Sequence, residues 1–324
     1  MALTPKDSKH ALQILAGTTG RKKGHEFEFA LAELVNNAGN SIDSSNQITG
    51  VFTGNPALGL IKKCLNVCGW DSYDSIEAIP LGALATAEDG KKWLEVNNVK
   101  VKASKSDILL NIYRNTDIKT IGVSVKQCLA TKPTNPQLFL STARAFCNLL
   151  RRSNIAVSES AEIAMRQFCG DEGFRPIDDS ALMRTRKSNP VRFYWEEINR
   201  QGLIEWEALL TNKQDEVTRL LLQKAYLDDP FSPEVIIQKT KKVLSGPEEF
   251  AIYSIDELVS KSREHVGFVK TSKTEVSKSK SYDVPKGVKH ECPKFGIVQM
   301  QRFGNKQNAT QLQFNLQAGY FYNI

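Results

Sequence analysis

Apolar side chains recur at helical spacing in two stretches near the start of the chain. Residues 22–39 carry apolar positions three and four apart and end on Gly39, which suits a helix C-cap, and residues 55–68 predict a second helix. The pattern then shortens to the period of strands. Residues 108–113 and 120–126 predict the two strands of a β-hairpin, with the polar segment R-N-T-D-I-K turning between them.

Helical spacing returns after the hairpin and continues through the middle of the chain. The stretch N-P-Q-L-F-L-S-T-A-R-A-F-C-N-L-L-R-R offers Asn135 as N-cap and Pro136 at the first position of a helix. From about Ser158 to His265 the segments again have helical periodicity, and they include S-P-E-V-I-I-Q-K-T-K-K-V-L at residues 232–244. Several of them begin with Ser or Asp caps, so this region is predicted to be a mainly helical subdomain.

The last part of the chain alternates apolar and polar residues. Leu312, Phe314 and Leu316 alternate with amide side chains, which is the period of a half-buried strand. Residues 295–303 are predicted to be its antiparallel partner in a terminal β-ribbon. The sequence thus predicts an α/β fold of the mixed α+β kind. Its three regions are a core over residues 1–155, a helical subdomain over residues 156–266, and a basic loop with the β-ribbon over residues 267–324.

Composition indicates an ordinary globular protein. The chain has 324 residues, of which 41% are hydrophobic and 24% charged. No apolar run has the length of a membrane span, and the first residues lack the hydrophobic core of a secretory signal. We therefore expect a cytoplasmic protein without a membrane partner.

Positive charge gathers in one segment near the end of the chain. The formal net charge is +7, and lysines crowd the Ser/Thr-rich residues 269–289. Such a segment is either a solvated surface loop or a loop that becomes ordered when its ammonium groups meet phosphates. The candidates for DNA contacts in this loop are Lys273, Lys278 and Lys280.

The polar face of the predicted terminal strand is rich in amides. Glutamine and asparagine can make the bidentate contacts that read adenine edges, and a two-stranded ribbon fits a major groove. The face is therefore either a DNA-reading surface or an ordinary solvent-exposed one. Its members are Gln311, Gln313, Asn315 and Gln317.

The predicted hairpin places an acid and an amine near each other. Asp107 precedes the first strand and Lys126 ends the second. Such a pair can act on a scissile phosphate, because the acid and a backbone carbonyl can ligate a divalent cation while the ammonium orients a water or helps to deprotonate it. The chain has no G-x-x-x-x-G-K-[ST] phosphate loop and no G-x-S-x-G elbow, which disfavours ATP-driven enzymes and hydrolases with a covalent intermediate.

The order of these segments resembles the PD-(D/E)XK nuclease superfamily, and within it the type II restriction endonucleases. The matching segments lie within residues 24–152 and read G-H-E-F-E-F-A-L-A-E-L, then K-S-D-I-L-L, then I-G-V-S-V-K-Q, then the helix from Pro136. In that family a helix with a glutamate precedes a hairpin that carries an aspartate and the (D/E)-x-K motif, and a helix follows. The resemblance implies a nuclease core in the first region of the chain.

The resemblance also implies roles for single residues. Asp107 and Lys126 correspond to the catalytic acid and lysine, and Asp107 with the backbone carbonyl of Val125 would ligate Mg²⁺. Glu28, rather than Glu26, is expected to be the glutamate of the first helix.

This chain departs from the family pattern at two serines. Ser124 stands where the family has an acid, as a candidate catalytic residue that leaves one fewer charged ligand, and Ser106 stands where a proline is usual. Gln127 is expected either to contact phosphate or to cap the strand end. The implied function is a Mg²⁺-dependent, type II site-specific deoxyribonuclease of a restriction-modification system, acting on double-stranded DNA, with a homodimer suited to cutting both strands of a palindrome. The alternative is a non-catalytic, sequence-specific DNA-binding protein that keeps the hairpin as a scaffold.

Overall fold

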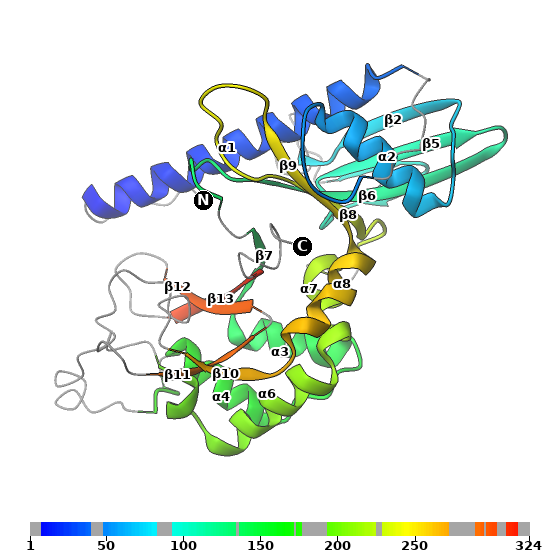
Figure 1. Ribbon diagram of the computed structural model, residues 1–324. Helices are drawn as coiled ribbons and strands as arrows, with labels where there is room; N and C mark the ends of the chain where they lie inside the picture. The colour runs from blue at the N-terminus through cyan, green and yellow to red at the C-terminus, as the bar shows by residue number, and fades with distance from the viewer. Residues whose placement is uncertain are drawn as a thin grey trace. The chain divides into compact units, whose positions relative to one another are not determined.

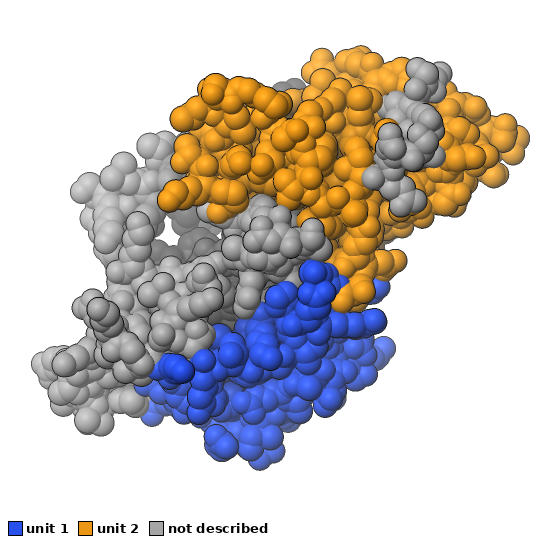
Figure 2. Space-filling view, in the orientation of Figure 1, with its two compact units in different colours: residues 1–12, 137–221, 261–317 blue, residues 13–136, 222–260, 318–324 orange. Residues whose placement is uncertain are grey.

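The computed structural model divides the chain into two compact units (Figure 2). The sheet unit comprises residues 13–136, 222–260 and 318–324, and the helical unit comprises residues 1–12, 137–221 and 261–317. Each unit joins segments that are far apart in the sequence, so the three consecutive regions predicted as 1–155, 156–266 and 267–324 do not coincide with the two units. The structure describes residues 8–39, 48–82, 93–133, 136–171, 173–176, 193–224, 229–271, 289–294, 296–302 and 309–316.

A six-stranded mixed sheet organises the sheet unit, in the order β1-β9-β8-β6-β5-β2 (Figure 1). β6 and β8 run parallel, and the other neighbours run antiparallel. The fold is therefore mixed α/β, as the sequence predicts. The strands are β1 (Gly50–Thr53), β2 (Ser75–Pro80), β5 (Ile108–Arg114), β6 (Asp117–Gln127), β8 (Pro233–Lys239) and β9 (Glu249–Ser254).

β5 and β6 form the predicted hairpin, which is confirmed with a tighter turn. Arg114 pairs with Asp117, so only Asn115 and Thr116 lie between the two strands. Asn115 has a φ of 52°, in the left-handed region, which asparagine tolerates better than most residues because its side chain can hydrogen-bond locally. The short turn fixes the register of the two strands that carry the candidate acid and amine.

Two helices cover one face of this sheet. α1 (Ser8–Asn36) and α2 (Pro56–Cys68) contribute Leu31 and Leu60, among other apolar residues, to one buried cluster with Val123 of β6. Leu31, Leu60 and Val123 are fully buried. The apolar face of each helix therefore anchors it to the sheet.

Both helices were predicted, and both are confirmed. Asn55 caps α2 by accepting a hydrogen bond from the backbone N–H of Ala57 at 2.9 Å, and Gly69 ends the helix with a φ of 68°. α1 begins ahead of its predicted start, and Gly39 with its positive φ follows its last turn.

The other face of the sheet has a smaller apolar cluster. Side chains alternate along a strand, so Leu109 of β5 points away from α1 and α2. It packs with Val96 of β3 (Leu94–Val96) and Val101 of β4 (Val99–Val101), which form a two-stranded sheet of their own.

Residues 232–244, which were predicted to be helical, contain strand β8 instead. Val235, Ile236 and Ile237 are all buried, because β8 lies between β6 and β9 and both of its faces are covered. A short apolar run of this kind fits a buried strand as well as a helix, and its β-branched side chains favour the strand. The helix predicted just after it is confirmed as α8 (Ile255–Ser262).

The helical unit is built around buried aromatic side chains. The ring of Trp206 stacks on Phe146 at 5.9 Å, and its indole N–H donates to the backbone carbonyl of Ala161 at 2.8 Å. Trp195 stacks on Phe168 at 4.5 Å. The segment around Trp195 was predicted to be helical and has one short 3-10 turn, η2 (Trp195–Glu197). The helices are α3 (Ala143–Arg152), α4 (Glu159–Cys169) and α6 (Arg200–Asn212), while α7 (Gln214–Gln223) carries the chain from this unit into the sheet unit.

The helix predicted from Pro136 begins later than expected. Gln137–Ser141 forms strand β7, and α3 begins after Thr142, whose hydroxyl accepts a hydrogen bond from a first-turn N–H at 3.1 Å. Pairing with a strand from the far end of the chain outweighs the helix-start signal of the proline. Asn135, the predicted cap, lies outside the described residues.

The predicted C-terminal ribbon is present, with β7 as a third strand. β12 (Gly296–Arg302) pairs antiparallel with β13 (Ala309–Leu316), and β7 pairs with the other edge of β13. A separate two-stranded sheet consists of β10 (Phe268–Thr271) and β11 (His290–Pro293).

In the part of the chain that the structure describes, no helix combines the length and the apolar character that crossing a membrane requires. All six cysteines are buried thiols.

One ion pair with a buried ammonium predicts a measurable loss of stability. The Lys63 ammonium, on a side chain only 3% exposed, lies 2.6 Å from Glu257 Oε1 and 3.1 Å from Thr49 Oγ1. Glu257→Ala should lower the free energy of unfolding by about 2 kcal/mol, because it leaves a buried ammonium without its counter-charge. Chemical denaturation measures this loss.

The matched control is Glu216→Ala. Glu216 pairs with Lys213 at 2.8 Å, and both side chains are about half exposed, so its removal should cost less than about 0.5 kcal/mol. Equal losses of unfolding free energy in the two variants would contradict a larger contribution from the Lys63–Glu257 pair.

Candidate active site

The backbone of Asp107 is held from both sides. Its N–H donates to the carbonyl of Val123 on β6 at 2.8 Å, and its carbonyl accepts from the N–H of Leu81, just after β2, at 2.9 Å. Asp107 therefore lies where the hydrogen-bonded pairing of β5 with β6 ends. Its position is fixed by main-chain bonds rather than by its own side chain.

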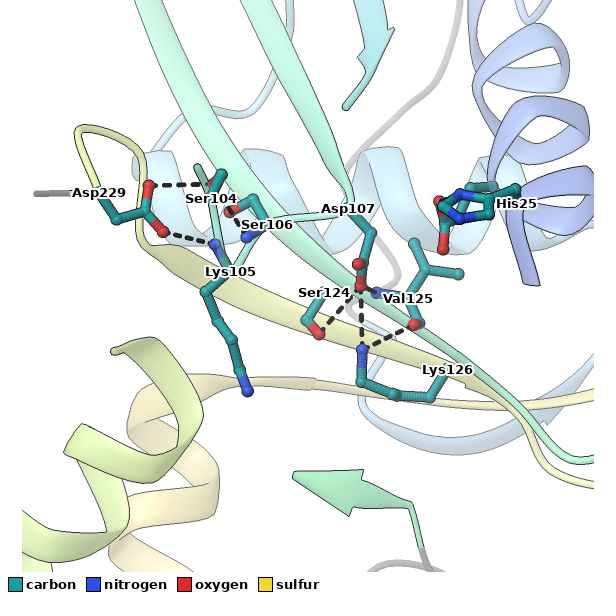
Figure 3. Close-up of polar contacts among 10 residues, drawn as sticks. His25, Ser104, Lys105, Ser106, Asp107, Ser124, Val125, Lys126 and Asp229 are labelled. Atoms are coloured by element: carbon teal, nitrogen blue, oxygen red, sulfur yellow. Dashed lines mark hydrogen bonds and ion pairs between the residues drawn. The ribbon is translucent and has the colours of Figure 1, made fainter. Parts of the chain in front are cut away.

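Three donors from β6 converge on one oxygen of Asp107 (Figure 3). Oδ2 accepts hydrogen bonds from the backbone N–H of Val125 at 2.6 Å, from Lys126 Nζ at 3.0 Å and from Ser124 Oγ at 3.2 Å. Lys126 Nζ also donates to the carbonyl of Val125 at 2.8 Å. The side chains of Asp107 and Lys126 are about a quarter exposed, at 26% and 24%. The structure thus brings the predicted acid, amine, serine and carbonyl into one cluster.

Glu28 of α1 lies within electrostatic range of this cluster. Burial, and then the negative charge of Asp107, raise the pKa of Glu28, while His25 and Lys126 act in the opposite direction. His25 Nδ1 lies 3.2 Å from Glu28 Oε2. Glu28 is buried and Glu26 is exposed, so of the two glutamates only Glu28 faces the sheet.

A loop before Asp107 is tied to the segment that leads into β8. The Ser104 hydroxyl donates to Asp229 Oδ1 at 3.0 Å, and the backbone N–H of Lys105 donates to Asp229 Oδ2 at 2.5 Å. The Ser106 hydroxyl donates to the carbonyl of Phe231 at 2.6 Å. One carboxylate and one carbonyl from the β8 side therefore fix the loop that presents the acid, and Figure 3 shows the contacts of the carboxylate, Asp229.

Lys105 adds a second amine that the sequence did not indicate. Burial, and then the positive charge of Lys126, lower the pKa of Lys105 to about 8. Two ammonium groups beside two carboxylates form a site with strongly opposed charges, of the kind found where proteins bind charged ligands. The only signal in the sequence was a lysine next to the S-D dipeptide, which no spacing rule singles out.

Gln127 continues the other face of β6. Alternation along the strand places it on the face of Val125, which belongs to the apolar cluster under α1 and α2. Its Oε1 is buried and has no hydrogen-bond partner among the described residues. A phosphate contact by Gln127 stays a prediction.

The predicted DNA contacts on β13 belong to the helical unit. On β13 of the helical unit, Gln311 and Gln313 pair in register with Gln301 and Gln299 of β12, so the amide positions continue onto a second strand. Asn315 lies on the same strand, opposite Ile297. Outside the described residues lie Lys273, Lys278, Lys280 and Gln317.

The oxygens of the cluster are hard donors. The carboxylates of Asp107 and Glu28 and the carbonyl of Val125 are the ligand types that Mg²⁺ prefers. Among the described residues no group of three or more His, Cys, Asp or Glu side chains is arranged to hold a metal ion. A cation here would therefore depend on a backbone carbonyl and on water as well as on carboxylates.

Known proteins show little similarity to this chain. No family model and no curated protein matches the chain. A solved structure with some likeness is the restriction endonuclease MspI in complex with its cognate DNA, with a TM-score of 0.45 and 12% identity over 79% of this chain and 76% of that chain. A TM-score and an identity this low do not assign a fold family or an activity.

The raised pKa of Glu28 predicts how its removal changes stability with pH. For an acid whose pKa is raised by folding, the favourable contribution is present at pH below the unfolded value and is lost as the pH rises through the folded value. Glu28→Gln should therefore raise the melting temperature at pH 7 in metal-free buffer, by roughly 1 to 3 °C. The gain should disappear at acidic pH, where the Glu28 carboxyl is protonated and is as neutral as the amide that replaces it.

Thermal unfolding at pH 4 and at pH 7 measures this difference. The matched control is Glu26→Gln. Glu26 is an exposed residue of the same helix, so this variant should show no such pH dependence. A Glu28→Gln variant that is less stable than the parent at both pH values would contradict the electrostatic account.

Proposed function

We propose that this chain is a Mg²⁺-dependent, type II site-specific endonuclease that hydrolyses DNA phosphodiester bonds by direct attack of water. The support for this proposal is the convergence of Ser124, the Val125 amide and Lys126 on one oxygen of Asp107 at the mouth of the hairpin. Glu28 lies close enough for the charge of Asp107 to raise its pKa. Two acids and an amine brought together in this way can hold a divalent cation and orient a water for attack on a phosphodiester.

The donor set fits a magnesium ion. Asp107, Glu28 and the Val125 carbonyl would hold it, and the repulsion between the two carboxylates is a cost that a cation would remove. When bound, the ion supplies charge stabilisation at the phosphate and lowers the pKa of a bound water.

Lys126 has the geometry of a group that orients the attacking water. Its ammonium is fixed by Asp107 Oδ2 at 3.0 Å and by the Val125 carbonyl at 2.8 Å, and an ammonium has a third proton to donate to a water or a phosphate oxygen. Asp107 sets the position of that ammonium. Lys105 brings a second positive charge to the same end of the sheet and would attract the phosphate backbone.

Ser124 acts on Asp107 rather than in place of an acid. Its hydroxyl donates to Asp107 Oδ2 at 3.2 Å and is buried, so it orients the carboxylate and adds no negative charge. Because the site has one fewer anionic ligand, it is less suited to binding a second metal ion.

Recognition of a particular DNA sequence would depend on other parts of the chain. The amide positions on β12 and β13 and the lysine-rich segment at residues 269–289 are the candidates to read bases and contact phosphates. A homodimer would place two such sites symmetrically on a palindrome. The alternative function, sequence-specific DNA binding without catalysis, uses the same surfaces and differs in one measurable outcome.

A plasmid digest tests the proposal. Purified protein with Mg²⁺ should give discrete, reproducible fragments, and EDTA should abolish them. Asp107→Asn and Lys126→Ala should each lower the cleavage rate by at least about a hundredfold, because one removes the anionic ligand and the other the ammonium that orients the water. The matched controls are Asp117→Asn and Lys102→Ala, which are exposed residues of the same sheet unit and should cut like the parent.

The same digest separates the two functions. A plasmid that is shifted on a gel but never cut, with Mg²⁺ or Mn²⁺, would support the DNA-binding protein and reject the enzyme. Ca²⁺ should sustain binding without cleavage, because its looser coordination seldom supports the in-line attack.

Ser124→Ala should have a milder effect than loss of the acid. Two of the three donors to Asp107 Oδ2 remain, so the loss of one neutral hydrogen bond should lower the cleavage rate about tenfold. Single-turnover cleavage compares the variants directly. A loss as large as that of Asp107→Asn would mean that the serine contacts the reacting groups itself.

A further inference from the structure

Glu28 is held by a neighbour on its own helix. His25 lies one turn earlier on α1, and its Nδ1 is 3.2 Å from Glu28 Oε2. The His25 side chain is 29% exposed and the Glu28 side chain 11% exposed. With Nδ1 protonated, the ring donates a hydrogen bond that fixes the rotation of the carboxylate.

Gly82 leaves the space in which this contact forms. A Cβ on residue 82 would lie 2.4 Å from His25 Nδ1 and 2.8 Å from Glu28 Oε2, both closer than a real Cβ approaches other atoms. Gly82 does not have a positive φ, so its backbone conformation would accept an alanine. The requirement for glycine is therefore steric, and it concerns the His25–Glu28 pair.

The backbone at residue 82 is tied to Asp107. Leu81 is 3% exposed, and its N–H donates to the carbonyl of Asp107 at 2.9 Å. Residues 81 and 82 cannot move away from α1 without breaking this bond. A side chain at residue 82 would displace the His25–Glu28 pair before it displaced the strand that carries the acid.

A buried glutamate beside another acid needs such support. The charge of Asp107 repels an ionised Glu28, and a flexible side chain would turn toward solvent to escape it. A hydrogen bond to the ionised carboxylate opposes that rotation. Partners of this kind, one contact removed from a metal, typically change metal affinity by 10- to 100-fold when they are mutated.

We propose that His25 and Gly82 are positioning residues for Glu28, with His25 anchoring the carboxylate through Oε2 and Gly82 keeping open the space beside Asp107 in which the anchored carboxylate lies. The proposal rests on the proposed function in one respect, that Glu28 contributes to a divalent cation site. It assigns neither residue a contact with DNA or with the reacting atoms.

Three substitutions of His25 test the anchor with Mn²⁺ as the probe, by calorimetric titration in the absence of DNA. His25→Asn retains a donor near the position of Nδ1, His25→Gln places its donor near the position of Nε2, and His25→Ala has none. We expect His25→Ala and His25→Gln to weaken Mn²⁺ binding about tenfold and His25→Asn to remain within about threefold of the parent. Equal Mn²⁺ affinity in all three variants, or an equal loss in all three, would overturn the anchor.

Cleavage kinetics give a second measure of the anchor. In His25→Ala the Mg²⁺ concentration for half-maximal cleavage should rise about tenfold, while the rate at saturating Mg²⁺ falls much less. A histidine that only stabilises the fold would lower the melting temperature without moving this Mg²⁺ concentration.

Gly82→Ala tests the space, with Gly24→Ala as the matched control. A Cβ on Gly24 would be 4.0 Å from Glu28 Oε1, an ordinary contact, so Gly24→Ala should leave Mn²⁺ affinity unchanged. Gly82→Ala should weaken Mn²⁺ binding about tenfold in the parent chain and cause no further loss in a Glu28→Ala background, because the two changes remove one interaction. Additive losses would show that Gly82 acts through another residue and would overturn its part of the proposal.

The titration separates this proposal from the proposed function. A parent that binds Mn²⁺ and responds to the variants as expected, but never cuts DNA, supports the positioning role and rejects the enzyme. A parent that binds Mn²⁺ and cuts DNA, with variants that bind Mn²⁺ like the parent, rejects the positioning role alone. A parent that does not bind Mn²⁺ rejects both.

Discussion

The contact between Lys126 and Asp107 is the interaction on which the candidate site depends. The two side chains are only about a quarter exposed, so their attraction is screened less than that of a surface pair. It forms only because β5 and β6 are paired up to Val123 and open beyond it, and because the Val125 amide reaches the same carboxylate oxygen. The buried cluster beneath α1 and α2 holds both strands in that register. The contact between Lys126 and Asp107 is therefore a consequence of where the pairing of the hairpin strands ends and of the packing that fixes their register.

The same site contains contacts that reduce stability. Glu28 is buried near the charge of Asp107, and Lys105 is half-buried near the charge of Lys126, so the pKa of Glu28 is raised and the pKa of Lys105 is lowered. Like charges held together in a partly buried position cost free energy that the fold has to offset. A polyanion and a divalent cation are the ligands that would relieve both repulsions at once. This opposition of charges supports a role in binding phosphate and metal more directly than any similarity in sequence does.

The site also requires parts of the chain that are far apart in sequence. Asp229 and Phe231, which precede β8, fix the loop before Asp107, and β8 supplies the parallel neighbour of β6. The hairpin alone has neither support. Parallel pairing needs a long connection, here the residues that build most of the helical unit. The loop before Asp107 therefore gains its support only when this long-range pairing is present.

The sequence by itself determined the features that short-range patterns control. The hairpin followed from its polar turn, α2 from its helical spacing, and the pairing of β12 with β13 from alternation. Asp107 and Lys126 were predicted to meet because strand ends could be located, and strand ends decide which side chains meet. Only the tertiary structure decided the rest. The apolar run of β8 fits a helix or a strand equally well until both its faces are seen to be covered, and β7 exists because β13 lies beside it. His25, Gly82 and Lys105 have no spacing that marks them, because their importance comes from distances across elements that no local pattern encodes.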